Sequence, residues 1–195
     1  TPSTSSAASD VYKRQFYNVE EHEGLVAVTV MSILEKNGNA FDAAVATGFA
    51  LQVVEPHLNG PGGEVPLILC PNGENPVVIC GQGVAPNSAS LKTFSDMNLN
   101  IIPGSGLLPA VVPGAFDAWM LLLLNYGTMS LRTVLEPAIG IAIKGYPLVP
   151  NIINTIKSVE ELFKKEWTSS AEIYLPNGKV PSTVSYTHLR AHETV

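Results

Sequence analysis

Charged residues are scarce in this chain of 195 residues: they make up 14% of it, and basic residues are the rarer kind. Eleven basic against seventeen acidic residues give a formal charge of −6. Proteins that bind a phosphate backbone need lysines and arginines gathered in a patch or stripe. The sequence shows no such patch, so we expect no nucleic-acid partner.

Long hydrophobic runs are also lacking. The most apolar run, from Ala118 to Leu124, stops at Asn125 and is far shorter than the roughly 20 residues that cross a bilayer. We therefore predict a buried helix there and no transmembrane segment in this chain. Because 46% of the residues are apolar, the chain can bury a substantial core, and we do not expect disorder.

Cysteines number only two, Cys70 and Cys80, one on each side of a turn-forming segment. Two cysteines do not make a disulfide framework. They can pair across a hairpin, or they can lie as free, buried thiols in apolar strands, which is the interpretation we favour. The compartment stays open between periplasmic or extracellular and cytoplasmic.

Clusters of metal-ligating residues are missing as well. His188 and His192 are four residues apart and Glu193 is adjacent, which superficially suggests a zinc helix. The zinc pattern requires glutamate directly after the first histidine, where Leu189 stands. We predict no metal site and no cofactor, and we assign the other histidines no role.

Both ends look foreign to the rest of the sequence. Residues 1–15 begin rich in serine and threonine and lack the apolar segment of a signal peptide. The stretches 9–15 and 184–194 resemble translated adapter sequence. We therefore expect one domain over residues 16–183, flanked by non-native or disordered tails at 1–15 and 184–195.

Helical spacing of apolar residues and capping signals predict five helices. Asn39 is placed to cap the second of them through the amide of Asp42. That second helix is apolar nearly all round, which predicts a position between layers of the fold. The predicted helices are Gly24–Lys36, Ala40–Val54, Ala115–Tyr126, a helix from Ser130 to about Lys144, and Asn151–Glu166.

Two short apolar runs surround Asn72-Gly73 and predict a β-hairpin with strands 65–70 and 77–81. A glycine-rich loop, which ends in Gly60-Pro61-Gly62-Gly63, precedes the first strand. Such a loop is either a tight connection, the commoner case, or a place where backbone amides face a ligand. Residues 171–181 are predicted to form a small exposed turn.

Three stretches carry motifs in a fixed order and spacing. The first is Gly38 to Ala46, and the second is the loop from Pro56 to Gly63 with the hairpin and Ala85-Pro86 after it. The third combines short motifs: Val112-Pro113-Gly114, Tyr126-Gly127, Pro137-Ala138 and Ala142-x-x-Gly145-Tyr146-Pro147. Together, over about residues 24–182, the three stretches resemble the gamma-glutamyltranspeptidase family in its order and spacing.

The resemblance implies an α/β (α+β) fold, the αββα sandwich of N-terminal nucleophile hydrolases, of which this chain holds an incomplete N-terminal portion. In that family a precursor cuts itself, and the threonine that begins the second subunit is the nucleophile. Residues 16–183 hold no counterpart of its Thr-Thr-His-type segment. We therefore expect no catalytic residue in this chain, and we expect the chain to be inactive by itself.

The implied enzyme is a transferase or hydrolase of the glutathione hydrolase type. Its substrate is a small-molecule amide such as a gamma-glutamyl compound, and its partner is the small subunit of the same precursor. We predict that the substrate is bound by Gln82, Asn59, Gly62 and Gly63.

Gln82 aligns with a position where the resemblance implies an arginine that binds the substrate's α-carboxylate. A neutral amide supplies no charge, and loss of a charge-assisted contact costs about 1.5–3 kcal/mol. The acyl donor and acceptor therefore stay open, as in related acylases. The other interpretation of Gln82 is a solvent-facing turn residue.

Two alternatives compete with an enzyme. The chain can be a non-catalytic ligand-binding or interaction module that reuses the half-fold, or an unrelated α/β domain. A module predicts a transcript that stops near residue 183, whereas an enzyme predicts a threonine-led second half downstream.

Overall fold

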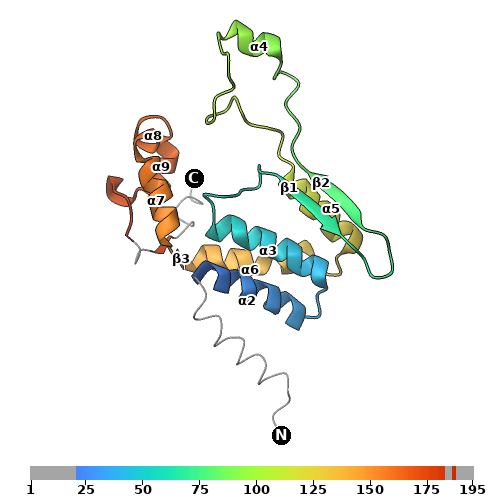
Figure 1. Ribbon diagram of the computed structural model, residues 1–195. Coiled ribbons are helices and arrows are strands. Elements are labelled where there is room, and N and C mark those ends of the chain that lie inside the picture. Colours follow the sequence, from blue (N-terminus) through green and yellow to red (C-terminus); the bar gives the residue numbers. More distant parts are fainter. Residues whose placement is uncertain (1–20, 183–185, 188–195) are drawn as a thin grey trace. The chain divides into compact units, whose positions relative to one another are not determined.

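The computed structural model describes residues 21–182 and 186–187 (Figure 1). The chain divides into two compact units. The first unit holds the residues up to Asn59 and those from Gly127 onward, and the second unit is Gly60–Tyr126. Each unit is described by itself. The predicted tail 1–15 lies outside the described residues, as does 184–195 apart from 186–187, so the domain boundaries stay predictions.

Three helices of the first unit lie side by side (Figure 1): α2 (Glu21–Glu35), α3 (Ala40–Val54) and α6 (Leu131–Lys144). Helix α3 packs against both of the others. Its apolar surface explains this position, since seven of its residues are buried, and small side chains let the neighbouring helices approach. The buried residues are Asp42, Ala43, Val45, Ala46, Phe49, Ala50 and Val54.

The start of α3 is fixed by a reciprocal cap. The Oδ1 of Asn39 accepts hydrogen bonds from the backbone amides of Phe41 and Asp42, both at 2.9 Å, and an Asp42 carboxylate oxygen accepts the amide of Asn39 at 2.8 Å. This is the capping box, and the predicted Asn39 cap is confirmed. Asp42 is fully buried and also accepts hydrogen bonds from Thr128 and Met129, which precede α6.

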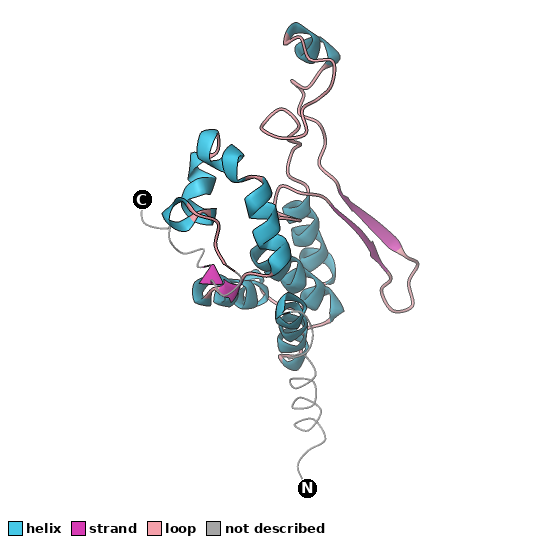
Figure 2. Ribbon diagram, turned by 60° about the vertical axis from the view of Figure 1, so that its left-hand side comes forward, coloured by secondary structure: helices cyan, strands magenta, loops and turns pink. Residues whose placement is uncertain are grey.

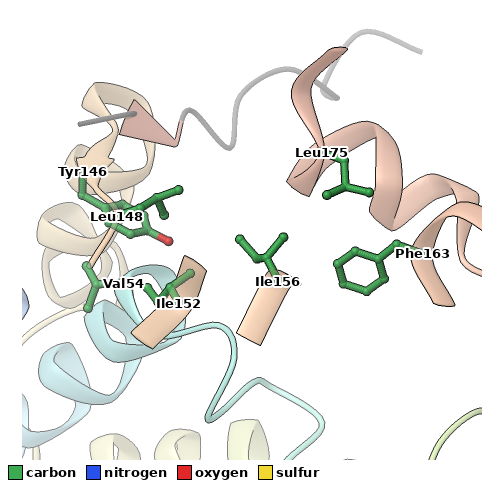
Figure 3. Packing of buried hydrophobic residues seen from close by; sticks show 7 residues of the cluster. All are labelled: Val54, Tyr146, Leu148, Ile152, Ile156, Phe163 and Leu175. Carbon is green, nitrogen blue, oxygen red and sulfur yellow. The ribbon is translucent and has the colours of Figure 1, made fainter. Parts of the chain in front are cut away.

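The rest of the first unit packs around a cluster of buried apolar side chains (Figure 3). Strand β3 (Tyr146–Pro147) pairs antiparallel with β4 (Tyr186–Thr187). Helices α7 (Pro150–Ser158), α8 (Glu160–Lys165) and α9 (Thr168–Tyr174) follow β3, and the 3-10 helix η1 (Pro176–Gly178) comes next. The buried residues of the cluster are Val54, Tyr146, Leu148, Ile152, Ile156, Phe163 and Leu175.

Two predictions about this region were wrong. The helix predicted over residues 151–166 is interrupted at Val159, where the backbone leaves helical geometry and α8 starts anew. Just before the break, the Thr155 carbonyl accepts the helical bond from the Val159 amide at 3.2 Å and a second bond from the Ser158 hydroxyl at 2.7 Å. The turn predicted at 171–181 instead contains most of α9 and η1.

The second unit consists of a hairpin, two helices and long connections. Strands β1 (Val65–Leu69) and β2 (Val77–Gly81) pair antiparallel, as predicted, and form the long magenta hairpin of Figure 2. Helix α5 (Ala115–Tyr126) packs against them. Side chains alternate along each strand, so Leu69 and Ile79 are buried. Helix α4 (Leu91–Asp96) lies in the long connection between β2 and α5.

The two cysteines lie on the opposite, exposed face of this hairpin region. Both thiols are free, as favoured above, but the predicted burial was wrong. The register explains why they do not meet: Cys80 lies opposite Pro66, whereas Cys70 follows Leu69, the partner of Val77. Among the described helices, none is both long enough and apolar enough to cross a membrane.

Candidate substrate-binding site

Gln82 lies between two glycines whose backbone is in close contact with its neighbours. A Cβ atom added at Gly81 would overlap the carbonyl oxygen of Val65, and one added at Gly83 would overlap that of Val112. Gly114 completes the packing, because a Cβ there would lie 2.6 Å from the carbonyl oxygen of Gly81. Only glycine fits these three positions without displacement of the chain, and their packing sets the position of the Gln82 backbone.

Hydrogen bonds hold the same segments together. The amide of Val112 donates to the carbonyl of Val84 at 3.0 Å, and the amide of Ala115, the first residue of α5, donates to Gly63 at 3.2 Å. The glycine loop, the end of β2 and the start of α5 are therefore joined by backbone contacts within the second unit. This arrangement presents the Gln82 side chain at the surface.

The Gln82 side chain contacts two polar groups. Its Nε2 donates to a carboxylate oxygen of Glu64 at 3.0 Å, and the thiol of Cys80 lies 3.8 Å from its Oε1. Glu64 is one position beyond the pair Val65–Gly81, so it lies directly across the hairpin from Gln82. All three side chains are exposed. The group can accept and donate hydrogen bonds at the surface.

The two predicted glycines differ in their surroundings. Gly62 is exposed, and a Cβ there would meet nothing within 4 Å. Gly63 is in a turn, since its amide donates to the carbonyl of Gly60 at 2.9 Å while its own carbonyl accepts from Ala115. The loop thus contains a tight turn at Gly60–Gly63, the commoner of the two expected cases. Gly63 is followed directly by Glu64, whose side chain accepts the hydrogen bond from Gln82.

Asn59 belongs to the first unit, and its side chain turns back on α3. Its Nδ2 donates to the carbonyl of Glu55 at 3.0 Å and to that of Leu51 at 3.4 Å. Both carbonyls also accept backbone amides, that of Leu51 from Glu55 at 2.8 Å and that of Glu55 from Leu58 at 3.1 Å. The Asn59 side chain is therefore bonded to the C-terminal end of α3, and the role predicted for Asn59 in substrate binding stays a prediction.

Sequence reasoning missed Glu64 and the glycines at 81, 83 and 114. The hairpin register carried the signal for Glu64, because a pairing of Val65 with Gly81 places Glu64 opposite Gln82. The Gly-Gln-Gly sequence carried the signal for the glycines, although only the structure shows which backbone atoms they approach.

The described residues hold no group of three histidine, cysteine, aspartate or glutamate side chains placed to bind a metal ion. His188, His192 and Glu193 lie outside the described residues. In the first unit, a groove of about 410 Å³ lies between α2 and α6, and an ion pair of 3.0 Å between Lys36 and Glu136 is part of its lining. None of the four predicted substrate-binding residues lines this groove.

Residues 27–193 of the chain match the sequence model that describes gamma-glutamyltranspeptidases. The chain belongs to the gamma-glutamyltranspeptidase family. The predicted family is thereby confirmed, and the match covers all four of the predicted substrate-binding residues.

Individual proteins are similar to most of this chain over a minor part of their own length. The glutathione hydrolase-like YwrD proenzyme of Bacillus subtilis is 37% identical over 157 residues, which are 76% of this chain and 28% of that relative. The solved structure of LmbA2991HD has a TM-score of 0.82 and 51% identity, and covers 84% of this chain and 28% of its own. A cephalosporin acylase from Bacillus halodurans has a TM-score of 0.77 and 33% identity, with 83% of this chain and 31% of its own covered.

These structures also confirm the predicted fold class. The chain holds part of the αββα sandwich of the N-terminal nucleophile hydrolases. It spans 28% of the length of the YwrD relative.

Proposed function

We propose that this chain supplies the large-subunit portion of an enzyme that cleaves a gamma-glutamyl or related acyl amide. The observation that carries the proposal is the family match over residues 27–193. The named relatives support it, since one is a glutathione hydrolase-like proenzyme and another is a cephalosporin acylase. The non-catalytic module gains no support from these names.

In this proposal the nucleophile comes from the small subunit of the same precursor. The hydroxyl of its first residue, a threonine, attacks the amide carbonyl, and its free amine takes the proton. The acyl–nitrogen bond breaks, the amine leaves with a proton, and the acyl group stays on the threonine oxygen as an ester. Water or an acceptor amine then attacks this ester and releases the threonine.

The residues of this chain bind the acyl donor in the proposal. Gln82 donates and accepts hydrogen bonds at the end of β2, and Gly62, Gly63 and Asn59 belong to the loop before β1. The packed glycines beside Gln82 support this assignment, because a fixed backbone positions a recognition side chain at little entropic cost.

The test is recovery of the transcript beyond the codon for Thr183, followed by expression of the complete precursor that it encodes. We expect the precursor to cut itself into two chains, of which the smaller begins with threonine, and to hydrolyse acyl p-nitroanilides. Exchange of that threonine for alanine should abolish both cleavage and turnover. An open reading frame that stops near residue 183, or an uncut precursor without turnover, would refute the proposal.

A further inference from the structure

We propose that Glu64 is a specificity-determining residue: paired with Gln82, it disfavours a carboxylate on the bound acyl donor and favours an amine or another hydrogen-bond donor. The inference rests on the proposed function, because it takes Gln82 as part of the donor site. It concerns which charge the acyl donor carries beside Gln82.

Geometry provides the first step. The Gln82 Nε2 donates to Glu64 at 3.0 Å, and the register places the two residues directly across the hairpin. This bond occupies one of the two Nε2 hydrogens, so a single N–H remains as a donor to a substrate carboxylate. The remaining lone pairs of the Glu64 carboxylate and of the Gln82 Oε1 are acceptors, so the pair as it stands offers more acceptors than donors.

The charge of the second unit provides the second step. Residues 60–126 contain a single basic residue, Lys92, against four acidic ones, Glu64, Glu74, Asp96 and Asp117. Lys92 is itself paired with Asp96 at 2.6 Å. No other cationic side chain exists in this unit to offset Glu64. A carboxylate beside Gln82 would therefore meet a like charge.

The positive end of α5 acts in the opposite direction. Its first amide, that of Ala115, already donates to Gly63, and Asp117 in its first turn adds negative charge. Both features weaken the attraction of that helix end for an anion. The balance therefore favours a neutral or cationic group beside Glu64.

The test uses the 195-residue chain and two probes that share an amide and a three-carbon chain and differ in their charged end group. 4-Aminobutanamide ends in an ammonium group, and glutaramate, of the same length, ends in a carboxylate. Each is titrated while the side-chain amide resonances of Gln82 are followed by ¹H–¹⁵N NMR, with the resonances assigned by their loss in Gln82→Ala. We expect a Kd about threefold lower for 4-aminobutanamide, the size of effect typical of exposed charges.

Two variants separate Glu64 from the general charge of the chain. Glu64→Gln should abolish the difference between the probes, and Glu64→Lys should reverse it. Glu74→Gln, the same change near the turn of the same hairpin, should leave the difference intact.

Equal affinities for the two probes, a preference for glutaramate, or no shift with either probe would overturn the inference. So would a preference that survives in Glu64→Gln. Because the test measures binding to this chain, its outcome does not depend on self-cleavage or turnover of the precursor, which test the proposed function.

Discussion

Asp42 is a carboxylate without exposed surface, and it joins the start of α3 to the segment before α6. It accepts hydrogen bonds from the amides of Asn39, Thr128 and Met129 and from the Thr128 hydroxyl. Burial alone would raise the pKa of Asp42, but the hydrogen bonds from Thr128, Asn39 and Met129 outweigh it and hold the pKa below its ordinary value.

Asp42→Asn should lower the free energy of unfolding by about 3 kcal/mol, because the new amide group cannot accept from donors on both of its atoms. Urea unfolding at neutral pH followed by circular dichroism measures the loss. Glu35→Gln, an exposed acid at the end of α2, is the control and should change stability by less than about 0.5 kcal/mol. Equal stabilities of the Asp42→Asn variant and the wild type would contradict this account.

The lowered pKa of Asp42 also predicts a pH dependence. The unfolded chain binds this proton more tightly than the folded chain does, so the carboxylate contributes its full stability above pH of about 4 and loses it as the pH falls through the folded pKa. Urea midpoints measured from pH 7 down to pH 2 should fall in the wild type. They should fall less steeply in Asp42→Asn, and parallel curves would show that another group titrates.

At the scale of elements, the end of β2 depends on the glycines beside Gln82. Gly83→Ala should force Val112 away from Val84 and break the hydrogen bond of 3.0 Å between them, because the new Cβ overlaps backbone atoms that cannot turn aside. Hydrogen exchange followed by NMR should show the Val112 amide exchanging at least about tenfold faster.

Gly62→Ala is the matched control for this change. Both substitutions add one methyl group to a glycine of the same unit, but the Cβ at residue 62 would meet nothing within 4 Å. We expect the Val112 amide to exchange as slowly in Gly62→Ala as in the wild type. Faster exchange in both variants would mean that the loop, and not the glycine packing, controls this segment.

The elements that the sequence predicted well carry local signals. The Asn39 cap and the hairpin around Asn72-Gly73 are set by neighbours along the chain, and both agree with the structure. The break at Val159 and the exposure of Cys80 were mispredicted. The helical spacing of apolar residues continues from residue 151 to residue 166 and gives no sign of the break. The exposure of Cys80 depends on which face of the hairpin meets α5. The Glu64–Gln82 contact joins residues 18 apart, so it follows from the register of the two strands and not from a pattern of neighbouring residues.

At the scale of the whole molecule, the second unit exposes an apolar face of its hairpin. Ile68 is 80% exposed and Val78 is 66% exposed, and they lie opposite each other on the face away from α5. Both strands are also edge strands among the described residues, with backbone groups available for pairing. Exposed apolar strands of this kind promote association between chains.

We therefore expect the 195-residue chain alone to self-associate, with a sedimentation coefficient that rises with concentration in velocity ultracentrifugation. Replacing Ile68 and Val78 together by threonine keeps the β-branched shape and should raise the association Kd by at least about tenfold, since tenfold corresponds to about 1.4 kcal/mol, which is less than the full burial of two such side chains contributes. Leu91 and Leu107, which are 90% and 92% exposed outside the hairpin, provide the control when replaced by threonine. That control pair should associate like the wild type. A wild-type chain that sediments as a monomer at every concentration would show that the hairpin face drives no association.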